Sequence, residues 1–197
     1  MKVEPVVLQG RHVRLVPMTL GHVPALWEAS DAELWRLTVS RVGSEDDMRR
    51  YVREALDAQA RGKALPFVTL DAAGERTIGS TRVGNVDAVN RRVEIGWTWI
   101  AAPWQRTAVN TEAKYLMLRH AFETLGCIRV ELKTDVLNER SRKAILRIGA
   151  REEGILRKHA ITEGGRIRDT VYFGIVDDDW PSVKARLESM LTGAPGR

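Results

Sequence analysis

The most regular hydrophobic pattern in the chain lies between residues 104 and 126. It predicts a largely buried helix that follows a short polar turn. One stripe consists of Tyr115, Leu118, Ala121, Phe122 and Leu125, and Ala113, Leu116 and Met117 widen it. A helix that is apolar over so much of its circumference is held in the core, so its first turn is fixed. The unpaired N–H groups and partial positive charge of that turn suit a phosphate or pyrophosphate.

The chain before this helix predicts four strands and two helices. The strands are residues 12–16, 65–70, 77–86 and 91–100, of which the last three form an antiparallel meander. Between the first two strands, Thr19 caps one helix, and Ser44 begins a second that ends at Gly62. Segment 32–38, between these helices, is apolar but poorly periodic. We expect it to be a mobile cover.

The chain after the central helix predicts a second group of elements. They are a strand over residues 129–135, a helix over 138–148, a strand pair over 151–157 and 170–176, and a last helix capped by Asp179. Gly149 is expected just after its helix, and residues 193–197 are expected to be a disordered tail. This order predicts one domain over residues 1–197, of the α+β class, with a mixed, mostly antiparallel sheet of about seven strands.

Composition and charge limit the possible functions. The chain has 197 residues, a hydrophobic fraction of 44% and a net charge of +5, with a pI of 9.6. The charge favours an anionic ligand or partner, such as coenzyme phosphates, RNA or a ribosome, but does not choose between them. No apolar run is long enough for a membrane span, and we identify no signal peptide. The single cysteine agrees with a cytoplasmic location.

Three motifs, in this order and spacing, resemble the GNAT superfamily of N-acyltransferases, and within it the RimJ/RimL-type branch, which acetylates protein N-termini and related amines. The motifs are Val93-Glu94-Ile95-Gly96-Trp97, the turn from Gln105 to Asn110, and Asn138-Glu139-Arg140-Ser141 followed by Ile148-Gly149-Ala150. The resemblance covers the chain from Leu8 to the last strand. It implies a GNAT-type fold with helices on both faces of a twisted sheet, and acetyl-CoA as the cosubstrate.

The turn before the central helix is similar to the family's pyrophosphate loop, written Q/R-x-x-G-x-G/A. Gln105 fills the first position, but Ala108 and Asn110 replace the two small residues. Ala108 adds one methyl group, a small obstacle if its φ is negative. Asn110 would either crowd the coenzyme or donate a side-chain N–H to it. The resemblance implies coenzyme contacts at Trp99, Ile100, Gln105, Arg106, Thr107, Ala108, Val109, Asn110, Asn138, Ser141 and Arg147.

Glu94 is the candidate general base, a role that a glutamate on this strand has in some family members. Strand alternation places Val93, Ile95, Trp97 and Trp99 on one face of the sheet, and Glu94, Gly96, Thr98 and Ile100 on the other. Gly96 leaves room for a ligand beside Glu94. The alternative is a solvated carboxylate paired with Arg91 or Arg92.

Other residues are candidates for supporting roles in acyl transfer. By the resemblance, Asn138 contacts the pantetheine arm, and backbone N–H groups near Trp99 and Ile100 hold the oxyanion. Ser141 is a candidate donor to the leaving thiolate, with water as the alternative proton source. Asn138 is also expected to cap its helix. Cys127 is expected to be a buried core residue, because no activating base accompanies it.

The acceptor side is expected to involve Trp35 and Trp97 beside Glu94, whereas Trp27 is expected to pack in the core. The basic group of Arg140, Arg142, Lys143 and Arg147 either holds the coenzyme's terminal phosphates or is a solvated helix face. The four histidines show no metal-ligand spacing, so we expect no metal.

Several functions follow from these features. The first is direct transfer of an acetyl group from acetyl-CoA to a primary amine, such as a protein N-terminal α-amine, with a ribosomal protein as one candidate. A small-molecule amine, such as a polyamine or antibiotic, is a second type of acceptor. A non-catalytic acyl-CoA-binding protein is the alternative that the altered loop keeps open. An RNA-binding module is the interpretation based on charge, and no aromatic-studded strand supports direct nucleic-acid binding. The family makes a homodimer plausible, and no membrane partner is expected.

Overall fold

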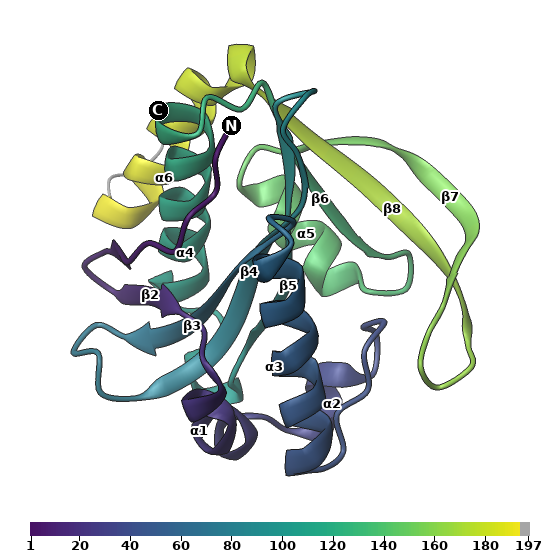
Figure 1. Cartoon of the computed structure of the whole chain (residues 1–197). Helices are drawn as coiled ribbons and strands as arrows, with labels where there is room; N and C mark the ends of the chain where they lie inside the picture. The colour runs from purple at the N-terminus through teal and green to yellow at the C-terminus, as the bar shows by residue number, and fades with distance from the viewer. Residues whose placement is uncertain (194–197) are drawn as a thin grey trace.

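The computed structural model describes residues 1–193 and contains one eight-stranded sheet (Figure 1). Its strands follow the order β1-β2-β3-β4-β5-β6-β8-β7. They are β1 Leu8–Gln9, β2 Val13–Pro17, β3 Leu65–Asp71, β4 Thr77–Asp87, β5 Arg92–Ile100, β6 Arg129–Asp135, β7 Arg151–Ile161 and β8 Ile167–Val176. Every neighbouring pair is antiparallel except β5 and β6. The α+β class, the mixed sheet and the meander are confirmed. The two-residue β1 adds an eighth strand to the expected seven.

The helices begin close to where the sequence predicts. They are α1 Val23–Ala29, α2 Ala32–Trp35, α3 Glu45–Ala60, α4 Ala108–Arg119, α5 Glu139–Arg147 and α6 Trp180–Thr192, with short 3-10 turns at Leu20–His22, Ala102–Trp104 and Asp177–Asp179. Ser44 caps α3 by accepting a hydrogen bond from the N–H of Asp47. The central helix does not stay α-helical to its end, because His120–Thr124 forms a π-helical turn.

Two details at the C-terminal helix differ from the sequence prediction. The side chain of Asp179 does not cap α6 and instead accepts a hydrogen bond from Arg151. Gly193 is not part of a disordered tail, because it ends α6 in a left-handed conformation with φ of 69°. The rest of the expected tail, residues 194–197, lies outside the described residues.

The helices cover both faces of the sheet, as predicted (Figure 1). One face packs on α4, α5 and α6 through a large core that includes Val93, Ile95 and Leu116. The other face packs on α1, α2 and α3 through a smaller core that includes Trp35, Tyr51 and Trp99. We call these the α4 face and the α3 face.

β5 and β6 pair only along their first residues and then separate. Arg92, Val93 and Glu94 pair with residues 129–131, and no later residue of β5 pairs with β6 among the described residues. β5 continues beside β4, whereas β6 continues beside β8. The backbone of residues 95–100 therefore faces an edge that no neighbouring strand fills.

The alternation of β5 breaks at Trp97, which corrects the predicted faces. The register with β4 shifts between Ser80 and Arg82, and Trp97 has a φ of 49°. This β-bulge turns Trp97 and Trp99 toward the α3 face, where both join the smaller core. Val93 and Ile95 remain on the α4 face. The prediction that these two tryptophans lie opposite Glu94 is therefore wrong.

The closing strand pair is longer than predicted, and the tip of this hairpin reaches the segment before α3 (Figure 1). The N–H of Glu163 donates to the carbonyl of Val39, and the Glu163 carboxylate accepts from the N–H of Arg41 at 2.8 Å. Arg50 on α3 lies 3.5 Å from the same carboxylate.

Segment 32–38, expected to be a cover, begins with α2, which places Trp35 in the core with 7% of its surface exposed. No helix in residues 1–193 has the length and hydropathy that crossing a bilayer requires.

Candidate active site

The N-terminus of α4 has the geometry of an anion site. Thr107 caps the helix by accepting a hydrogen bond from the N–H of Val109 at 3.3 Å, and its own hydroxyl donates to the carbonyl of Trp104. Arg106, just before it, is exposed and has a φ of 62°. The side-chain cap thus uses only one of the N–H groups of the first turn. The remaining N–H groups and the helix dipole suit a diphosphate.

Gln105 ties this loop to the end of β5 and to α5. Its amide nitrogen donates to the carbonyl of Ile100 at 2.8 Å, and its amide oxygen accepts from Arg140 at 2.7 Å. Arg147, two turns further along the same face of α5, donates to the hydroxyl of Thr111 on α4 at 2.9 Å. The predicted coenzyme residues therefore come together from three elements around the open edge of β5.

The two departures from the family's loop have different surroundings. Ala108 is the first residue of α4 and does not have a positive φ, so its methyl group is compatible with the backbone there. The side-chain oxygen of Asn110 is buried and has no hydrogen-bond partner. Buried polar atoms are normally paired. The unpaired atom is an acceptor, so it complements an N–H or O–H donor and does not suit a phosphate oxygen.

The start of α5 brings Asn138 and Ser141 together, as their spacing predicts. The side-chain oxygen of Asn138 accepts from the N–H of Ser141 at 3.0 Å. The Ser141 hydroxyl is half-buried and makes no hydrogen bond with the described residues. Arg142 and Lys143 instead form ion pairs with Glu152 and Glu139. These two basic residues therefore fit the interpretation of a solvated helix face. Arg140 instead contacts Gln105 in the loop before α4, and Arg147 contacts α4 itself.

Glu94 is buried at the point where β5 and β6 separate, with 7% of its surface exposed. Its Oε2 accepts from Asn85 at 2.6 Å and lies 2.7 Å from Nζ of Lys133. The alternative pairing with Arg91 or Arg92 is not observed, because Arg92 pairs with Asp87 and Glu131. Oε1 faces Gly96, where a β-carbon would approach it to 3.0 Å. One carboxylate oxygen is thus anchored and the other faces the glycine gap.

Lys133 forms an ion pair with the carboxylate of Glu94. Burial lowers the pKa of Lys133, but the hydrogen bond and charge of Glu94, with Tyr172, outweigh this effect and leave the pKa raised. Its ammonium also lies 4.8 Å from the ring centre of Tyr172. The sequence analysis did not identify Asn85 or Lys133, since each lies on a different strand and only the sheet register brings them to Glu94.

A second buried charge on the α3 face is Arg82, which the sequence analysis also missed. Its guanidinium lies 4.1 Å from the ring centre of Tyr51 and 5.5 Å from that of Trp97. Nη2 donates to the carbonyl of Tyr51 at 3.1 Å. Trp35 packs against Tyr51 and Trp99, with ring centres 5.3 and 5.6 Å apart. A charged residue in the middle of a predicted strand was the signal that could have found this site.

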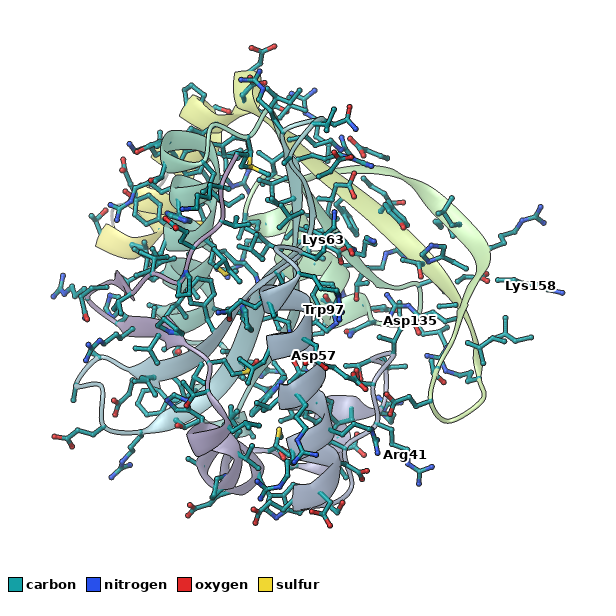
Figure 2. All side chains as sticks on the ribbon, in the orientation of Figure 1. Arg41, Asp57, Lys63, Trp97, Asp135 and Lys158 are labelled. Atoms are coloured by element: carbon teal, nitrogen blue, oxygen red, sulfur yellow. The ribbon has the colours of Figure 1, made fainter. Side chains whose placement is uncertain are left out.

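Charged groups continue along β6 and β8 next to Glu94. Asp135 is fully buried and accepts hydrogen bonds from Arg166 and from the N–H of Leu137. Arg168 lies 3.9 Å from the same carboxylate. Figure 2 shows Trp97 and Asp135 on the part of the sheet between α3 and the β7–β8 hairpin.

The cleft under the hairpin tip has a volume of about 660 Å³ and is lined by Arg41, Gly43, Asp47, Arg50 and Glu163.

The α4 face contains one buried cation near the candidate site. Nζ of Lys114 donates to the hydroxyl of Thr98 on β5 at 2.6 Å, and Thr98 also contacts the hydroxyl of Thr81 at 2.7 Å. Burial lowers the pKa of Lys114 to about 7. Lys114 therefore lies against the α4 face of the bulged part of β5, and its side-chain amine is partly neutral at physiological pH.

Cys127 is buried, as predicted, and burial raises its pKa to about 11. A thiol with so high a pKa is almost entirely protonated at neutral pH and is a poor nucleophile. Trp27 packs at the edge of the smaller core, as expected. Residues 1–193 contain no group of three or more His, Cys, Asp or Glu that could hold a metal ion.

Comparisons with known proteins agree with this geometry. A family model described as an acetyltransferase (GNAT) domain matches residues 12–151. A Bacillus subtilis (strain 168) protein named "Putative ribosomal N-acetyltransferase YdaF" is 36% identical over 106 residues, which cover 54% of this chain and only 57% of that protein. A crystal structure of an acetyltransferase from T. thermophilus, itself named putative, superposes with a TM-score of 0.88 at 36% identity, covering 97% of this chain and 100% of that one.

A third similar structure is Mycobacterium smegmatis RimJ in complex with CoA-disulfide. It superposes with a TM-score of 0.77 at 25% identity and covers 96% of this chain and 94% of that one. The family model spans well over half of the sequence and includes the strand with Glu94, the α4 loop and the start of α5. This chain belongs to the GNAT family of acetyltransferases.

Proposed function

We propose that this protein is an N-acetyltransferase that transfers an acetyl group directly from acetyl-CoA to a primary amine. The observation that carries the proposal is the position of Glu94 at the point where β5 and β6 separate, on the strand that precedes α4 and beside the strand that precedes α5. The head of α4 suits the coenzyme's diphosphate, and the unfilled edge of residues 95–100 offers backbone groups to an extended pantetheine arm.

The residues around this fork can perform the proton transfers that amide formation needs. Attack of a neutral amine on the thioester carbonyl forms the N–C bond, breaks the C–S bond, and releases one proton from nitrogen. Glu94 Oε1, facing the Gly96 gap, accepts that proton directly or through one water. The departing thiolate takes up one proton, for which the Ser141 hydroxyl or water is the donor. Backbone N–H groups near Trp99 and Ile100 stabilise the oxyanion.

The acceptor that best fits these residues is an α-amine, such as a protein N-terminus. An α-amine has a pKa of about 8 and a lysine side chain one of about 10.4, so the α-amine is more often neutral at pH 7. The names of similar proteins, RimJ and a ribosomal N-acetyltransferase, support the same class. A ribosomal protein is therefore the first candidate acceptor to test.

The test is release of free CoA from acetyl-CoA in the presence of a panel of N-terminal peptides and small amines. Glu94→Gln is expected to lower kcat by about 100-fold, because it removes the base while keeping the shape of the side chain. Coenzyme affinity, measured by calorimetry, should change less than twofold. Glu131→Gln is the matched control, since Glu131 pairs with Glu94 across the two strands but binds Arg92 and Arg129.

A non-catalytic acyl-CoA-binding protein is the competing function, based on the altered loop at Ala108 and Asn110. Acetyl-CoA raises the melting temperature under both functions. Binding without CoA release for any amine would favour the non-catalytic protein. Full turnover by the Glu94→Gln variant would remove Glu94 from the proposed mechanism.

A further inference from the structure

Arg82 is a buried cation without a counter-ion. Only 6% of its surface is exposed, and no carboxylate within residues 1–193 lies within 4.0 Å of its guanidinium. Its Nε atom is buried and has no hydrogen-bond partner. Burying a charge without pairing it is costly, so such groups are rare unless a ligand completes them. The contact with the ring of Tyr51 offsets part of this cost.

The sheet register places this cation beside the candidate base. Arg82 on β4 is directly opposite Gly96 on β5, and Gly84 is directly opposite Glu94. Residues related in this diagonal way lie about 7 to 8 Å apart on one face of a sheet. Both glycines lack a side chain, and the ring of Trp97 lies over Gly84.

Two further donors in the same aromatic group are also unpaired. The indole N–H groups of Trp35 and Trp99 are buried without a hydrogen-bond partner. Trp35 joins the group through its contacts with Tyr51 and Trp99. Together with Nε of Arg82, these are three buried N–H donors in one cluster, and the hydroxyl of Ser80, directly opposite Trp99, is also buried and unpaired. Their chemical complement is a group that offers oxygen acceptors and negative charge.

We propose that the acceptor is a primary amine that carries a carboxylate a few bonds away, and that Arg82 binds this carboxylate while Glu94 faces the amine. This inference rests on the proposed acetyl transfer and adds the class of acceptor. Trp35 lies on the four-residue helix α2 and packs against Trp99 and against Tyr51, the ring on which Arg82 stacks. In this proposal, the carboxylate reaches Arg82 when Trp35 moves aside.

The charges around Glu94 favour the same acceptor class. Lys133 already neutralises Glu94, and Arg166 and Arg168 accompany the single carboxylate of Asp135. With Arg82, this part of the α3 face carries four cations and two anions. A polyamine or an aminoglycoside-type antibiotic would bring additional positive charge to a site that is already positive, which disfavours both.

The test compares matched acceptors that differ only in the carboxylate. One pair is a peptide with N-terminal Asp and the same peptide with N-terminal Asn, and a second pair is free alanine and alaninamide. The wild-type protein is expected to prefer the carboxylate member of at least one pair by tenfold or more in kcat/KM. The pair that shows the preference identifies the source of the carboxylate, an acidic N-terminus or a free amino acid.

Arg82→Met is expected to reduce that preference to less than twofold, and Arg82→Lys to retain part of it. Arg119→Met is the matched control, because Arg119 also stacks on a tyrosine, with its guanidinium 5.4 Å from the ring centre of Tyr115, but on α4. A wild-type protein that uses both members of each pair equally well would overturn the inference. So would an Arg82→Met variant that slows both members by the same factor.

A measurement without turnover separates this inference from the proposed function. Calorimetry with CoA present compares the N-acetylated Asp peptide with the N-acetylated Asn peptide, which are the products of the first pair, and N-acetylalanine with N-acetylalaninamide. If no amine releases CoA, the proposed function fails, but tenfold tighter binding of a carboxylate compound that Arg82→Met abolishes would still support the Arg82 site. Equal binding in both pairs, together with no discrimination in turnover, would contradict it.

Discussion

The two faces of the sheet differ in how their buried polar groups are satisfied. On the α4 face, the carboxylate of Glu112 accepts hydrogen bonds from three successive backbone N–H groups at Arg11, His12 and Val13. On the α3 face, three buried N–H donors of Arg82, Trp35 and Trp99 are unpaired, whereas the buried unpaired atoms at the two ends of α4 are Oδ1 of Asn110 and Nε2 of His120. Fully paired groups stabilise a fold, whereas unpaired buried donors are tolerated mainly where a ligand completes them. Glu112 therefore fixes α4 to the start of β2, and the acceptor site that we propose lies among the unpaired donors of the α3 face.

The largest expected effect tests the structural role of the α4 face. Glu112→Ala leaves three backbone donors buried without a partner and should lower the free energy of unfolding by about 4 kcal/mol. Urea denaturation measures the change. Glu139→Ala is the control, because Glu139 is exposed and pairs only with Lys143. A loss below about 1 kcal/mol would show that the α4 face does not depend on this carboxylate.

The second effect tests the one buried cation that we place on the α4 face. Burial lowers the pKa of Lys114 to about 7 from 10.5, so the unfolded chain binds more protons between these values. The unfolding free energy should therefore rise with pH above 7, and the cost of burying Lys114 is fully present below pH 7. Lys114→Met should stabilise the protein by about 3 kcal/mol at pH 6 and flatten this rise.

Unfolding in urea at pH 6, 8 and 9.5 measures the Lys114 effect. Lys143→Met serves as the control, since Lys143 is exposed on α5 and should change neither the stability nor its pH dependence. If the Lys114→Met variant keeps the slope of the wild-type protein, another group is responsible for it.

The smallest effect tests the acceptor site on the α3 face. In Gly84→Ala, the new methyl group would lie 2.5 Å from Cζ3 of Trp97, so the indole must move away from residue 84. We expect kcat/KM to fall about tenfold, equivalent to about 1.4 kcal/mol. Gly164→Ala is the control, because its new methyl group meets only the Thr162 hydroxyl at 3.9 Å. Unchanged kinetics in Gly84→Ala would argue against a role for Trp97 at the acceptor site.

Local patterns in the sequence predicted the elements and several of their caps. Ser44 and Asn138 cap their helices as expected, because a cap depends on atoms within three residues. The hydrophobic stripe after residue 108 placed α4 in the core. The motifs at Gln105 and Asn138 begin two segments that the structure joins through the hydrogen bond between Arg140 and Gln105, and the role of Glu94 stays a prediction.

The neighbours of each site residue could not be predicted in the same way. Lys133 and Asn85 reach Glu94 from two other strands. Arg82 on β4 contacts Tyr51 on α3, which lies 31 positions earlier in the chain. The faces of Trp97 and Trp99 were predicted wrongly because a bulge adds one residue to β5 and reverses the alternation beyond it.

The sequence by itself therefore determined the fold class, the order of the elements and the fixed N-terminus of α4, because these follow from hydrophobic periodicity within short segments. Only the tertiary structure decided which charges pair, which buried donors stay unpaired and which face the tryptophans occupy. Those features depend on the register between strands that are far apart in the chain, and no local pattern encodes that register.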